Sequence, residues 1–143
     1  MNSKLLRDLI RDKQGAALIE FAILAPAIFA MMFGVLQIGY QMFTYNAVRA
    51  VASDTARYTI IEYQKQNLLT AGQIEDKAEA YAVNAPYDLD ATLLTATATK
   101  PVSDITGTTK FLLTLTYVPA NFLGFMSIRS PTITVTRPVY VAT

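Results

Sequence analysis

Glu20 is the residue of this chain whose surroundings most need a chemical explanation. It lies near the start of an apolar run over residues 16–38, five residues after Gly15. An ionisable side chain within a membrane-spanning segment costs on the order of a few kcal/mol, so it is normally paired with another group. We therefore expect Glu20 to have a partner and not to be solvated by lipid alone.

The apolar run itself predicts a membrane span. At about 1.5 Å per residue, it is roughly long enough to cross the hydrocarbon core of a bilayer. Four basic and two acidic residues precede it, and the first charge after Glu20 is Arg49. The positive-inside rule therefore predicts that Met1 lies in the cytoplasm and that the C-terminal part lies in the periplasm or outside the cell.

The residues after the span predict that the helix continues. Apolar and small side chains recur at helical spacing up to about Tyr63, which predicts one membrane and stalk helix over residues 16–63. Pro26 lies inside this helix and has no N–H to donate, so it predicts a kink. Membrane helices also tolerate proline, and the sequence leaves both outcomes open.

Residues 64–143 are expected to form a small α+β head on this helix. Thr70 and Gln73 match a capping box, which predicts a short second helix. From Asp90 onward, apolar and polar side chains alternate with a period of two, which predicts a small antiparallel sheet of about three strands. Pro138 cannot donate to a strand ladder, so the last strand is expected at an edge or with a bulge. The three alternating runs are 94–99, 111–118 and 132–141.

The composition excludes most catalytic constellations. The 143 residues include no cysteine and no histidine, which excludes disulfides, thiolate nucleophiles, histidine-based triads and the usual zinc sites. We expect no cofactor and no metal, and no nucleic-acid partner because no basic stripe follows residue 15. Carboxylates spread along a chain usually form a solvated face. A membrane-tethered enzyme would depend on five such acids, Glu75, Asp76, Glu79, Asp88 and Asp90.

The connection 119–128, between the second and third predicted strands, is more apolar than loops usually are. One interpretation is that its side chains fold onto the stalk helix and close a small core. The other is that they form a contact loop for a neighbouring subunit or for the membrane surface. The large apolar side chains of this loop are Phe122, Leu123, Phe125, Met126 and Ile128.

The order of residues in the N-terminal part resembles that of a known family. Gly15, followed by four apolar residues and Glu20-Phe21, resembles the processing site of type IV prepilins, most closely the short-leader kind of the tight-adherence (Tad or Flp) pilus system. The longer pattern over about residues 15–60 is similar to the N-terminus of TadE-like pseudopilins. Its further matching positions are Pro26, Gly34, 37–39, 46–49 and 54–58.

This resemblance implies a pilin-like lollipop with a leader peptide over residues 1–15. An aspartic membrane prepilin peptidase would cleave after Gly15 and leave Ala16 as the N-terminus. Glu20 and Phe21 would serve peptidase recognition and subunit pairing, with the Glu20 carboxylate against the N-terminal amine of an adjacent subunit. The partners implied are this peptidase, other pilin and minor pilin subunits, the inner-membrane pilus assembly platform and the lipid bilayer.

The resemblance also implies a role for the chain. It would be a minor pilin or pseudopilin of the bacterial inner membrane that acts in initiation, tip or assembly of an adhesion pilus. Its head is larger than that of the very short major Flp pilin, and a TadF-like protein fits the pattern as well. Residue 16 is Ala where many type IV pilins have Phe, so N-methylation does not follow. The alternative is an uncleaved single-span assembly or scaffold protein of the same membrane.

Overall fold

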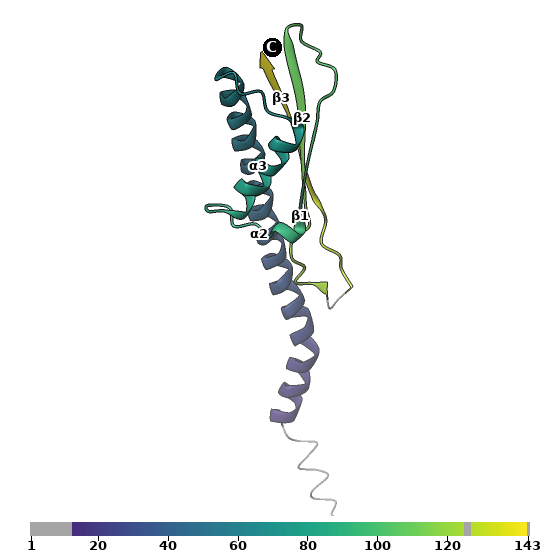
Figure 1. The fold of residues 1–143 in the computed structure, drawn as a ribbon. Helices are drawn as coiled ribbons and strands as arrows, with labels where there is room; N and C mark the ends of the chain where they lie inside the picture. Colours follow the sequence, from purple (N-terminus) through teal and green to yellow (C-terminus); the bar gives the residue numbers. More distant parts are fainter. Residues whose placement is uncertain (1–12, 125–126, 143) are drawn as a thin grey trace, which may run out of the picture.

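The chain forms one long helix that carries a small head along its C-terminal half (Figure 1). The computed structural model describes residues 13–124 and 127–142. It confirms the predicted α+β class, with a long N-terminal helix, a short second helix and a three-stranded antiparallel sheet. Most of the predicted leader, residues 1–12, lies outside the described residues. The elements are α2 (Lys13–Gln64), α3 (Ala71–Val83), the 3₁₀ turn η1 (Ala91–Leu93), β1 (Leu94–Thr99), β2 (Thr108–Tyr117) and β3 (Ile133–Ala142).

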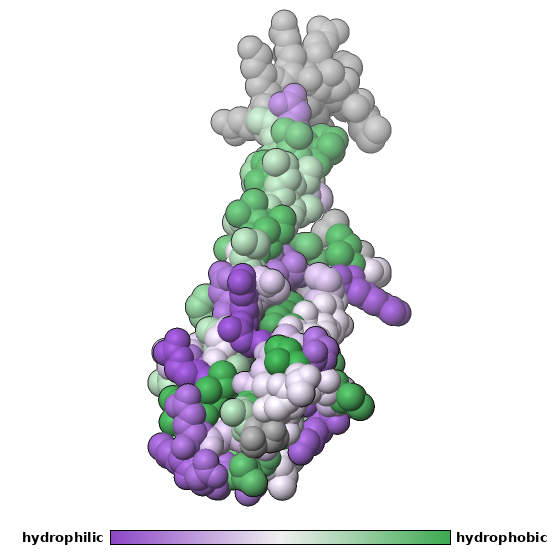
Figure 2. Space-filling model, turned by 90° about the horizontal axis from the view of Figure 1, so that it is seen from above, coloured by the Kyte–Doolittle hydropathy of each residue, from purple (hydrophilic) through white to green (hydrophobic). Residues whose placement is uncertain are grey.

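Helix α2 has 52 residues and contains the predicted segment 16–63. At about 1.5 Å per residue it is about 78 Å long, which is more than twice the thickness of the hydrocarbon core of a bilayer. Helical backbone continues on both sides of Pro26, so the proline does not end the helix, and a kink there stays a prediction. Figure 2 shows the N-terminal half as an apolar rod that leaves the mixed surface of the head.

The sheet is a simple meander in the order β1-β2-β3, and both pairs are antiparallel. Its register opposes Leu94 to Tyr117 in the first pair and Tyr117 to Ile133 in the second. β3 is an edge strand, as Pro138 predicts, and the pairing runs through Leu112 and Pro138 without a bulge. The alternation in β2 is confirmed, because its buried side chains are every second residue.

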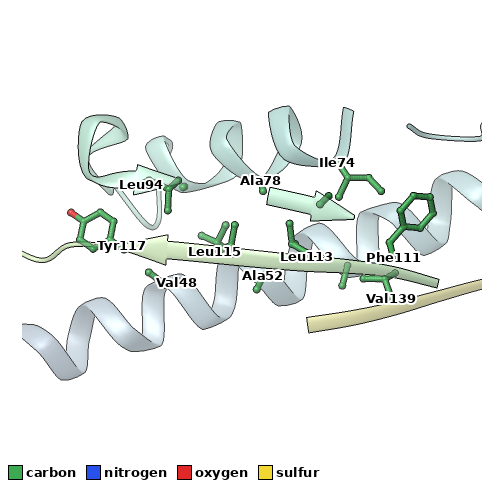
Figure 3. Packing of buried hydrophobic residues seen from close by; sticks show 14 of the residues in the cluster. Val48, Ala52, Ile74, Ala78, Leu94, Phe111, Leu113, Leu115, Tyr117 and Val139 are labelled. Atoms are coloured by element: carbon green, nitrogen blue, oxygen red, sulfur yellow. The ribbon is translucent and has the colours of Figure 1, made fainter. Parts of the chain in front are cut away.

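Both helices cover the same face of the sheet, with α3 over β1 and α2 over β3 (Figure 3). The central strand β2 contributes Phe111, Leu113, Leu115 and Tyr117 to the space between them. Each of these side chains is at most 2% exposed. The helices supply mostly small residues to this core, which lets their backbones lie close to the sheet. Those helical core residues include Val48, Val51, Ala52, Ala56, Ile74, Ala78 and Ala82.

The capping box predicted for the second helix is confirmed. Thr70 Oγ1 accepts a hydrogen bond from the backbone N–H of Gln73 at 3.3 Å, and Gln73 Oε1 accepts one from the N–H of Thr70 at 2.9 Å. These bonds satisfy two N–H groups that the start of a helix leaves without a partner. The cap therefore defines where α3 begins and places its apolar stripe over the sheet.

A hairpin loop between β1 and β2 closes the end of the head farthest from the N-terminal half of α2 (Figure 1). Gly107 ends the loop with a φ of 76°, a conformation that favours glycine. Asp104 accepts hydrogen bonds from Lys110 Nζ at 3.1 Å and from the Tyr140 hydroxyl at 3.0 Å. The bond from Lys110 is the main reason why the pKa of Asp104 is lowered.

Candidate processing and subunit-pairing segment

Most large apolar side chains in the N-terminal half of α2 are exposed. Among the described residues, α2 is the one helix long and apolar enough to cross a membrane, and its most apolar stretch is not buried inside the protein. Ile23 is 72% exposed, Met31 74% and Val35 72%. An exposed apolar helix of this length fits a membrane-anchored single span.

Glu20 lies on this bare helix, with Phe21 beside it at 61% exposed. Within residues 13–124 and 127–142, the ion pairs join Lys65 to Glu62 and Lys110 to Asp104, and Glu20 has neither an ion pair nor a hydrogen bond. The partner expected for this carboxylate is therefore not supplied by the described part of the subunit.

Gly15 and Ala16 lie within α2, so the peptide bond between them is helical in this structure. Ala16 precedes Glu20 by four residues, and residues at this spacing lie on one face of a helix, one turn apart. The helix thus brings the predicted processing site and the predicted pairing carboxylate to one side of the same turn. The roles of both residues stay predictions.

The apolar loop between β2 and β3 contacts α2 through Gln37. The Gln37 side chain is 5% exposed. Its Nε2 donates to the carbonyl of Ala120 at 3.1 Å, and its Oε1 accepts from the N–H of Phe122 at 2.7 Å. Ser130 Oγ accepts further bonds from Nε2 of Gln37 and of Gln41, both at 3.3 Å. Both ends of the loop are therefore attached to one turn of the helix.

The loop does not enter the buried core of the head. Phe122 packs edge-on against Tyr40, with ring centroids 5.4 Å apart, but remains 43% exposed. Leu123 is half-buried and Ile128 is 48% exposed, and none of these three belongs to the buried cluster. The loop thus folds onto the stalk without closing the core. The other two predicted contact residues, Phe125 and Met126, lie outside the described residues.

Gln37 is the residue whose importance for this site sequence reasoning missed. In the sequence it is only one position of a family pattern, whereas in the structure its side chain binds backbone groups 83 and 85 residues later in the chain. The available signal is its place at the end of the apolar run, with Gln41 one turn later. An amide at that position can satisfy backbone groups of a loop at the place where a helix leaves an apolar environment.

Two of the five acids on which an enzyme would depend, Asp90 and Glu75, have structural partners. Asp90 accepts hydrogen bonds from the N–H and hydroxyl of Thr92 at 2.8 and 2.7 Å, which lower the pKa of Asp90. Glu75 accepts the N–H of Ala98 at 2.6 Å. Among the described residues, no three acidic side chains are grouped closely enough to hold a metal ion. These carboxylates therefore support turns and a strand edge.

The Gln37 contact can be tested by the substitution Gln37→Ala. The Phe122 N–H and the Ala120 carbonyl would lose their partner. Both bonds are only partly buried, so each loss should cost about 0.5–1.5 kcal/mol, the net contribution of an ordinary hydrogen bond. We expect faster amide exchange in the loop, measured in detergent or nanodiscs, with unchanged exchange in β2. Gln41→Ala removes a single bond to Ser130 and serves as the control. Equal loop protection in both variants would contradict the role of Gln37.

The comparison with protein families identifies one segment of the chain. A family model described as TadE-like protein matches residues 15–57. This segment begins at Gly15, contains Glu20 and Gln37, and covers the exposed half of α2 and most of the part that packs on the sheet. No curated protein and no solved structure matched the chain.

Proposed function

We propose that this chain is a minor pilin or pseudopilin of the Tad pilus system, because a family model described as TadE-like protein matches residues 15–57. In this proposal, a prepilin peptidase removes residues 1–15, and the trimmed subunit acts in initiation, tip or assembly of a tight-adherence pilus. The excess of basic residues before the span supports a cytoplasmic N-terminus and a periplasmic head. The role is structural and not catalytic.

The observation that carries this proposal is the unpartnered Glu20 on a bare apolar helix. Cleavage after Gly15 would give Ala16 a free ammonium group. Inside a bundle of such helices, the ammonium of one subunit and the Glu20 carboxylate of the next would neutralise each other. Removing one member of a buried ion pair costs about 3–5 kcal/mol, so this pair would also define the register between subunits.

The surface of the span supports helix packing as the mode of assembly. Ala22, Pro26, Ala30 and Gly34 follow one another at intervals of four residues and form a narrow stripe of small residues on the helix. A Cβ atom added to Gly34 would meet no atom within 4 Å, so nothing in its own subunit requires glycine there. Small residues let membrane helices approach closely, which fits pilin subunits or the assembly platform as neighbours.

The processing step can be tested at Gly15. A peptidase that binds an extended chain must first unwind the helix around the Gly15–Ala16 bond. Gly15→Ala would oppose unwinding, because alanine favours a helix over glycine by about 1 kcal/mol. We expect cleavage to slow at least about fivefold, which corresponds to that free energy. Gly39→Ala, in the same helix and also without neighbours within 4 Å, is the matched control.

The N-terminal sequence of the protein recovered from membranes, with and without a prepilin peptidase in the cells, is the measurement. A start at Ala16 that depends on the peptidase supports the proposal. A start at Met1 in both cells contradicts it and favours the second candidate, an uncleaved single-span assembly or scaffold protein. The second candidate is favoured by the length of the apolar segment, which serves equally well as a permanent anchor.

A further inference from the structure

The loop 119–130 contacts α2 at the level where the helix leaves the membrane. The hydrocarbon core of a bilayer is about 30 Å thick, which corresponds to about 20 residues of helix. Counted from Leu18, the first large exposed apolar residue, such a span ends at about Gln37. Gln37, Tyr40 and Gln41 contact the loop. In a bilayer that α2 spans from Leu18, the loop would thus lie at the outer boundary.

The apolar surface of the span continues onto the loop. A groove of about 760 Å³ lies between them, lined by residues of α2 that include Leu36, Gly39 and Phe43, together with Phe122 of the loop. Phe43 is 62% exposed and Tyr45 43%. Tyrosine and tryptophan rings are typical of the interface between lipid and water, because one end is apolar and the other polar.

The charge of the loop favours a lipid surface. Residues 118–132 include no acid and one base, Arg129. Arg129 is exposed and forms no ion pair with any described residue. A long basic side chain can bury its stem along apolar surface and still reach the phosphate of a headgroup. Attraction of one basic residue to an anionic membrane surface amounts to about 1 kcal/mol.

From this position, continuity and charge, we propose that the described parts of this loop, residues 119–124 and 127–130, rest on the outer surface of the bilayer that α2 spans. Phe122 and Ile128 enter the boundary between headgroups and acyl chains, and Arg129 lies toward the phosphates. The head is then attached to the membrane at two places, the helix and the loop, which limits its rotation about the helix axis. The inference rests on the single span of the proposed function but not on cleavage after Gly15.

A single tryptophan tests this proposal, because the natural chain has none. The Phe122→Trp variant of the full chain is reconstituted at one copy per nanodisc. The lipids are brominated at the upper acyl positions, and about 30% of them are anionic phosphatidylglycerol. We expect bromine to quench the emission at least about twofold. Val102→Trp is the matched control, because Val102 is 94% exposed in the hairpin loop at the other end of the head (Figure 1).

Val102→Trp should be quenched by aqueous iodide and not by bromine. Two results would overturn the proposal and show that the loop does not rest on lipid. One is that Phe122→Trp behaves like this control, and the other is that its emission is blue-shifted but is not quenched by bromine. Ile128→Trp repeats the test at a second exposed position should the first variant lose its fold. Arg129→Gln should weaken the quenching in anionic discs and leave it unchanged in zwitterionic ones. None of these readouts depends on the N-terminal sequence, so failure here is distinct from failure of the processing step.

Discussion

Leu113→Ala is expected to lower the free energy of unfolding of the head by about 2–5 kcal/mol. Leu113 is 0% exposed in the middle of β2, the central strand, and lies between the two helices and the sheet (Figure 3). The substitution removes apolar contacts and leaves a cavity that this alanine-rich layer cannot fill. Because small domains have only about 5–15 kcal/mol of stability, a large part of it would be lost. Denaturant unfolding of the full chain in detergent measures the effect.

Leu112→Ala is the matched control for this prediction. It is the neighbouring residue of the same strand, but its side chain lies on the opposite face of the sheet and is only half-buried. Removal of the same atoms there should cost well under half as much, because water can occupy the space. An equal loss in both variants would show that the second face of the sheet is also covered, contrary to the two-layer fold described here.

The elements of the head could be predicted because their signals are local. The capping residues Thr70 and Gln73 and the alternation in β2 depend on neighbours a few residues away, and both are confirmed. The edge position of β3 followed from one chemical fact, the missing N–H of Pro138. Strand order was harder to predict, since it depends on pairing between distant segments, although the meander found here is the simplest arrangement.

The contact between the loop and α2 could not be predicted from such signals. It depends on two hydrogen bonds of Gln37 to Ala120 and Phe122, which are remote in sequence and have no periodic pattern. The apolar composition of the loop predicts that its side chains contact another surface, but it does not predict where the loop lies. The structure places the loop beside Gln37 and Tyr40 of α2, where Phe122 is partly covered by Tyr40 and otherwise exposed.

The processing and pairing residues were predictable from residue type and spacing, and their roles stay predictions. Glu20 is recognisable because a carboxylate is unusual in an apolar helix, and Gly15 and Pro26 are recognisable by their order around it. One subunit, however, contains no cation beside Glu20 in the part that the structure describes. If the pair forms between subunits, a single copy contains only an unpartnered charge. The geometry of one chain therefore indicates that Glu20 needs a partner without indicating which group that partner is.

Glu20→Gln is expected to prevent assembly while leaving the subunit folded. The amide is nearly isosteric, so helix α2 and the remote head should be unchanged. The N-terminal ammonium of the adjacent subunit would then be buried without its counter-charge, at a cost of about 3–5 kcal/mol, or a loss of assembly of about 10²-fold or more. The yield of the subunit in sheared pili, relative to its amount in membranes, measures this. Glu62→Gln is the matched control, because Glu62 lies on the same helix within the head, where its carboxylate pairs with Lys65 of the same subunit.

The N-terminal sequence of the Glu20→Gln variant separates the two roles assigned to this residue. If the variant begins at Ala16 but is absent from pili, Glu20 acts in subunit pairing, as proposed. If it retains Met1, the carboxylate is needed by the peptidase, and the loss of assembly follows from the missing free amine. Assembly equal to that of the Glu62→Gln control would show that Glu20 has no pairing role. The charge on this apolar helix would then need a partner outside the filament, and the assembly platform would be the place to look for it.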